Sequence, residues 1–156
     1  YLALAGFFIA IVASIGLSAY FPNDIRIEHN LWFGADIKRV ILYMTDPSFS
    51  HGRTSTHPLF PLFILPVGWP ISAVAGIFGF EQGLAQGISA QLITSLSGGI
   101  TWLLIYIISI NLGLSVLTSF ALGLLFLSSS AFIFWWSTPE SFAIGSVTIL
   151  LPFLFT

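Results

Sequence analysis

The residues of this chain that could do acid–base or phosphate chemistry lie almost entirely in one segment, residues 22–57. This segment holds all four basic residues, all three histidines and four of the six acids: Arg26, Lys38, Arg39, Arg53, His29, His51, His57, Asp24, Glu28, Asp36 and Asp46. Carboxylates act as general bases or hold divalent cations, and arginines bind phosphate oxygens. The segment could therefore serve a phosphate-bearing substrate, although a solvated loop of mixed charge has the same composition.

The rest of the chain is too apolar for a water-facing surface. The whole chain has 156 residues, of which 56% are hydrophobic and only 6% charged, and its mean hydropathy is +0.99. Soluble domains carry about 25% charged residues. We therefore expect an all-α, polytopic protein of the plasma or inner membrane, with the lipid bilayer as its surroundings. A net charge of −2 and the lack of a basic tail argue against a nucleic-acid partner, and the absence of cysteine excludes disulfides and thiolate metal sites.

Apolar runs predict four to five membrane spans, near residues 1–21, 58–79, 84–110, 116–136 and 142–156. The last run is shorter than the ~20 residues that a spanning helix needs. We therefore expect residues 1–156 to be one transmembrane module, the N-terminal part of a longer protein. Four prolines in the second run predict a kink or break there. Glycines 79, 83 and 87 predict a tight turn before the third run, and their spacing also permits close helix approach.

The polar segment contains one element with a helical pattern. Ile37, Val40, Ile41 and Met44 repeat at the helical period, which predicts a short amphipathic helix in the membrane interface. Asp36 and Arg39 lie three residues apart and should project to one side of it. His57 precedes the next apolar run and belongs at the water–lipid boundary. An acid, an arginine and a histidine at that depth suit a substrate with a lipid tail and a phosphate head.

Outside this segment, Glu140 follows Pro139 at the start of the last apolar run. It could be the N-cap carboxylate of that helix or a functional acid, and the residues leave both roles open. His51 and His57 are six apart, which matches no helical pair of metal ligands.

The motifs "FGADIKRVILYMTD" (33–46) and "HPLFPLF" (57–63) resemble the N-terminal module of GT-C glycosyltransferases, such as the protein O-mannosyltransferases and the lipid A aminoarabinose transferases. "STPESFAIGSVTILL" (137–151) resembles the second acidic position of that family. The resemblance implies an inverting enzyme that takes a sugar from a polyprenyl-phosphate donor on the non-cytoplasmic side. It implies that Asp36 and Glu140 are catalytic, and that Arg39, Arg53 and His57 bind the phosphate or the acceptor. If a divalent metal ion is used, Asp36 and His57 are its candidate ligands.

Two departures from the family pattern keep alternatives open. Many members have a second acid directly after the first, whereas Ile37 follows Asp36. In addition, Asp36 and Glu140 fall on opposite faces if every run between them crosses the membrane, so a shared site requires one re-entrant segment, most naturally 58–79. One alternative is a non-catalytic membrane subunit with protein partners. Another is half of a transporter.

The side of the membrane on which residues 22–57 lie is weakly specified by the sequence. The positive-inside rule taken literally places this loop in the cytoplasm, but four acids match its four basic residues and no other loop has Lys or Arg. The family resemblance implies the non-cytoplasmic side.

Overall fold

A computed structural model describes residues 1–20, 36–49 and 59–155. Every regular element within these ranges is helical, as the sequence predicted. The helices are α1 (Leu2–Tyr20), α2 (Ile37–Thr45), α3 (Leu59–Ile77), α4 (Gln82–Asn111), α5 (Val116–Leu127), α6 (Ser130–Trp135) and α7 (Ser141–Leu150), followed by a 3-10 turn (Leu151–Leu154). Within the described ranges three helices are long and apolar enough to cross a membrane: Leu2–Tyr20, Phe60–Ile77 and Gln82–Asn111.

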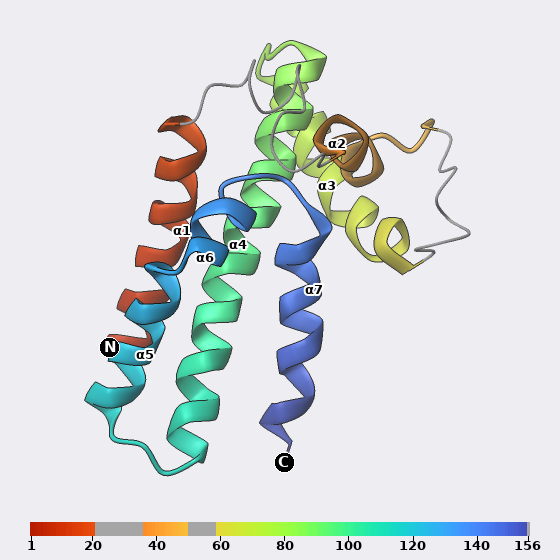
Figure 1. The fold of residues 1–156 in the computed structure, drawn as a ribbon. Coiled ribbons are helices and arrows are strands. Elements are labelled where there is room, and N and C mark those ends of the chain that lie inside the picture. Colours follow the sequence, from red (N-terminus) through yellow and green to blue (C-terminus); the bar gives the residue numbers. More distant parts are fainter. Residues whose placement is uncertain (21–35, 50–58, 156) are drawn as a thin grey trace.

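Helix α4 is the centre of the molecule and contacts α1, α2, α3, α5 and α7. Its 30 residues make a helix of about 45 Å, longer than the ~30 Å hydrocarbon core of a bilayer. Figure 1 shows α1, α5 and α7 running alongside it, with α2 and α3 gathered at the end where α4 begins. One end of α4 can therefore extend into the headgroup region.

The interface of α1, α4 and α5 is built around one large side chain. Trp102 of α4 is completely buried and lies between Gly6 of α1 and Gly123 of α5. A Cβ atom on Gly6 would come within 2.0 Å of the indole, and one on Gly123 within 2.4 Å. Glycine at both positions is thus what lets the three helices close on this ring.

The predicted span 116–136 is wrong as one helix, because the chain breaks between α5 and α6. Ser128 caps the end of α5, and the Ser129 hydroxyl accepts a hydrogen bond from the Phe132 amide (3.1 Å) and so starts α6. Serine hydroxyls compete for backbone groups in this way and favour helix ends. The carbonyl of Trp136, at the end of α6, accepts hydrogen bonds from Ser14 of α1 and from Gln91 of α4 (3.4 Å).

The second apolar run is a single helix, although Pro66 and Pro70 lie inside α3. The predicted break is therefore absent. Close packing accompanies this continuity: Gly68 lies against the Met44 carbonyl of α2, and the Gly68 carbonyl accepts a hydrogen bond from Ser89 of α4 (2.7 Å). In Figure 1 α3 slants across the same end of the molecule as α2, beside the first half of α4.

Helix α2 confirms the predicted amphipathic element and ends at Thr45, with Asp46 as its C-cap. Its apolar stripe, however, is covered by protein rather than turned toward lipid. Met44 is fully buried, and the stripe forms one cluster with Ala90 of α4, against which Phe60 and Ile64 of α3 and Ile144 of α7 pack. This cluster fixes α2 to α3 and α4.

Candidate functional site

The N-terminal end of α2 carries an ion pair between Asp36 and Arg39, the two residues that the sequence placed on one side of this helix. Asp36 precedes the first turn of α2, and its carboxylate pairs with the Arg39 guanidinium three residues later. The Asp36 side chain is 36% exposed and that of Arg39 35% exposed. Both charges are thus held in place by the helix and still reach the surface, so a ligand can contact either one.

Glu140 lies at the N-terminus of α7 and is only 5% exposed. One carboxylate oxygen accepts a hydrogen bond from the Ser141 amide (3.1 Å), which confirms the N-cap role that the sequence left open. One turn further, Ile144 packs against the cluster formed by the apolar stripe of α2 and Ala90 of α4. The two predicted acids therefore stand beside helices that pack on the same cluster.

The other predicted site residues cannot be placed in the same way. Arg53, His57 and His51 lie outside the described residues. Within the described ranges, no group of three or more His, Cys, Asp or Glu side chains could hold a metal ion. The metal pair Asp36 and His57 therefore stays a prediction.

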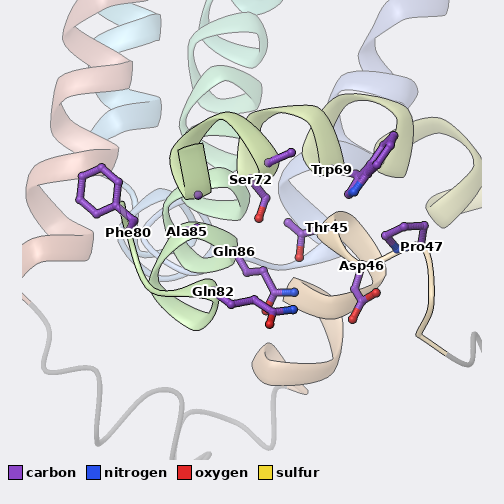
Figure 2. A pocket seen from close by; sticks show the side chains of 11 residues that line it. Thr45, Asp46, Pro47, Trp69, Ser72, Phe80, Gln82, Ala85 and Gln86 are labelled. Atoms are coloured by element: carbon purple, nitrogen blue, oxygen red, sulfur yellow. The ribbon is translucent and has the colours of Figure 1, made fainter. Parts of the chain in front are cut away.

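A cavity of about 270 Å³ opens at the other end of α2, between α2, α3 and the first turns of α4. Its walls come from Thr45, Asp46, Pro47, Trp69, Ser72, Ala73, Gly76, Phe80, Gln82, Ala85 and Gln86. Figure 2 shows the polar ends of Asp46, Gln82 and Gln86 lying together, with Trp69 and Phe80 farther out on opposite sides. The cavity thus combines a carboxylate, two amides and two hydroxyls with aromatic walls.

The polar groups of this cavity differ in whether they have hydrogen-bond partners within the protein. Asp46 accepts hydrogen bonds from the Ser48 amide (2.8 Å) and hydroxyl (2.7 Å), and Thr45 donates to the Ile41 carbonyl (2.7 Å). Gln86 and Ser72 are each only 8% exposed, yet neither side chain hydrogen-bonds to any residue that the structure describes. Buried polar side chains are usually paired, so these two groups are available to a molecule in the cavity.

Sequence reasoning missed this cavity, although part of its signal is visible in the sequence. Gln82 and Gln86 are four residues apart, so they share one face of a helix. The other polar walls come from α2 and α3, which tertiary packing brings together through Gly68 against Met44 and through Phe60 and Ile64 on the α2 stripe. By contrast, the polar face at Gln91 and Ser95 serves helix packing, because both residues hydrogen-bond to Ser14 of α1 (3.5 and 2.8 Å).

Comparisons with protein-family models, with curated proteins and with solved structures find no match to this chain.

Proposed function

We propose that this chain is the N-terminal module of a membrane glycosyltransferase that uses a polyprenyl-phosphate-linked sugar. The observation that carries the proposal is the partly exposed Asp36–Arg39 ion pair on α2, whose apolar stripe forms one cluster with Ala90 of α4; Ile144 of α7, one turn after the buried Glu140, packs against that cluster. Ionisable residues are expensive in or near the bilayer and mark functional positions there. The resemblance of residues 33–46 and 57–63 to GT-C enzymes supplies the reaction class.

Each residue of the proposed site would have a role that its side-chain chemistry allows. The Asp36 carboxylate would accept a proton from the acceptor hydroxyl, which requires a partly exposed group within reach of the substrate. The Arg39 guanidinium would bind phosphate oxygens of the donor and keep Asp36 in its charged form. Glu140, whose carboxylate caps α7, would be the second acid. Arg53 and His57 would join the phosphate end.

The arrangement of α3 also supports this assignment. Two acids on opposite membrane faces could not share a site, and a full crossing by every predicted span would separate them. Helix α3 slants beside the first half of α4, at the same end of the molecule as α2, and Ile144 of α7 packs against the cluster that joins α2 to α4. A shared site for Asp36 and Glu140 is consistent with this geometry.

The test is sugar transfer by the full-length protein in lipid nanodiscs, with Asp36→Asn as the variant. Asparagine keeps the size of the side chain but cannot accept the proton, so transfer should fall by about 10²-fold or more. Lys38→Gln is the matched control, because Lys38 lies on the exposed side of α2. If Asp36→Asn retains sugar transfer, Asp36 is not the general base.

One observation favours a non-catalytic membrane subunit as the second candidate. A Cβ atom added at Gly83 or Gly87 of α4 would meet nothing within 4 Å, so these small residues do not serve packing among the described helices. A second membrane protein could pack there. Co-purification of a partner at fixed stoichiometry, together with no transfer by the purified full-length chain, would favour this reading.

A further inference from the structure

The cavity at the C-terminal end of α2 has the properties of a ligand site that the proposed reaction centre does not include. Helix α2 has nine residues, so its ends lie about 13 Å apart. Asp36 and Arg39 stand at one end of this helix, and Thr45 and Asp46 border the cavity at the other. A ligand in the cavity reaches the ion pair only if it extends along α2.

The walls restrict the class of ligand. Among the residues that the structure describes, no Lys or Arg lines the cavity, so its described walls lack the groups that bind phosphate or carboxylate strongly. With one carboxylate among its walls, it is also a poor match for the carboxylate-rich sites of Ca²⁺ or Mg²⁺. Its volume of about 270 Å³ far exceeds the ~30 Å³ that one water molecule occupies, so it has room for a small organic ring.

The two unpaired side chains narrow the choice further. The Gln86 amide and the Ser72 hydroxyl each donate and accept hydrogen bonds, and both are more than nine-tenths buried without a partner among the described residues. A ligand that satisfies them must also donate and accept at several neighbouring points. Sugar hydroxyls do this, and the apolar face of a sugar ring can lie on an aromatic wall such as Trp69 or Phe80.

The cavity lies where such a ligand could reach it from water. Ser18, near the end of α1, hydrogen-bonds to Gln91 (2.9 Å), so Gln82 and Gln86 lie beyond the level at which the described part of α1 ends. The 45 Å length of α4, against ~30 Å of hydrocarbon, leaves room for these first turns in the headgroup region. Figure 1 shows this end of α4 rising past α1.

We propose that this cavity binds one ring of a neutral oligosaccharide and that the acceptor of the reaction is a glycan. The second half of this statement rests on the proposed glycosyltransferase function, whereas the binding of the ring does not. A glycan held by Gln86 and Ser72 would lie along α2 and present a hydroxyl to the Asp36 end. The cavity is thus the acceptor subsite, separate from the phosphate-binding end.

The experiment applies the full-length protein in biotinylated nanodiscs to an array of neutral and acidic oligosaccharides. We expect binding to a subset of the neutral glycans, and a loss of at least tenfold in Gln86→Leu because leucine offers neither donor nor acceptor. Ser97→Ala is the matched control: Ser97 is a buried residue of the same helix, outside the cavity, that bonds only to its own helix (2.9 Å to the Ile93 carbonyl). This control should bind as the wild type does.

Several results would overturn the proposal: no bound glycan, binding to acidic glycans alone, or equal binding by wild type and Gln86→Leu. If Gln86→Leu does not fold, Ser72→Ala replaces it with the same expected direction. A polyprenyl-phosphate hexose is tested in parallel, and Gln86-dependent binding of that lipid without any bound glycan would assign the cavity to the donor instead.

The glycan array tests the binding site and the transfer assay tests the enzymatic function, so either proposal can be contradicted without the other. If the protein binds glycans through Gln86 but shows no transfer activity, the glycan-binding site is supported and the glycosyltransferase function is contradicted. If transfer depends on Asp36 but glycan binding is unchanged in Gln86→Leu, the glycosyltransferase function is supported and the cavity is not its acceptor subsite.

Discussion

The two halves of α4 are packed in opposite ways. Around Trp102, in the second half, α1 and α5 approach so closely that only glycine fits at Gly6 and Gly123. Around Gln86, in the first turns, α2 and α3 leave a cavity of about 270 Å³. One helix thus serves as the structural axis at one end and as the wall of a candidate site at the other.

Unpaired polar atoms occur in both halves, but their surroundings differ. The indole nitrogen of Trp102 and the hydroxyl of Ser119 are fully covered and have no hydrogen-bond partner among the described residues. No ligand can reach those atoms, so they are a cost of dense packing. The side chains of Gln86 and Ser72 border open space instead. An unpaired group indicates a binding site only where a ligand can reach it.

The largest effect should come from filling the space beside Trp102. Gly6→Ala places a methyl group 2.0 Å from an indole that α5 confines on its other side at Gly123, so the helices must separate. We expect the free energy of unfolding to fall by about 1–3 kcal/mol. Thermal unfolding of the purified protein in detergent, followed by tryptophan fluorescence, measures this change.

Gly16→Ala is the control in the same helix, because a Cβ atom there meets nothing within 4 Å. It should leave stability unchanged or raise it by up to about 1 kcal/mol through helix propensity. Equal losses in the two variants would contradict the close packing of α1 on Trp102.

A smaller effect should follow from removing the hydroxyl of Ser14. This hydroxyl is fully buried, contacts the Ser95 hydroxyl (2.8 Å) and donates to the Trp136 carbonyl at the end of α6. Ser14→Ala leaves that carbonyl with only the long contact from Gln91 (3.4 Å). We expect a loss of about 1 kcal/mol in the same unfolding assay, and Ser97→Ala, with its bond inside one helix, should cost less. A Ser14→Ala protein as stable as the wild type would show that α6 does not depend on this contact.

The sequence predicted those features that depend on neighbouring residues. The apolar repeat of α2 and the position of Asp36 and Arg39 on one side of it follow from spacings of three and four residues. The turn between α4 and α5, where Gly113 has a positive φ, likewise falls in the gap between the predicted spans 84–110 and 116–136. Such patterns operate within one or two helical turns and need no tertiary information.

The break between α5 and α6 and the cavity required contacts between distant segments. Ser128 and Ser129 are visible in the predicted span 116–136, but serine is tolerated in many membrane helices. Here their hydroxyls bond to the Leu125 and Phe126 carbonyls at the break. Ser14 and Gln91, from two other helices, hold the far end of α6 by bonding to the Trp136 carbonyl. In the same way, the sequence around Gln86 does not distinguish it from other polar residues of a long helix. Its role depends on α3, which places Ser72 in the same cavity.

The smallest effect on stability, and the sharpest contrast with Ser14, should come from Ser72→Ala. Both serines are buried, but Ser72 has no hydrogen bond to a described residue, so its removal sacrifices none. Because the Ser72 hydroxyl borders the open cavity, water can bond to it without ligand, and its removal leaves no covered group unpaired. We therefore expect a change between zero and a gain of about 0.5 kcal/mol, from the higher helix propensity of alanine, in the unfolding assay without ligand. A loss as large as that of Ser14→Ala would mean that Ser72 holds the helices together. The two ends of α4 would then differ only in packing density, and Ser72 would not mark a binding site.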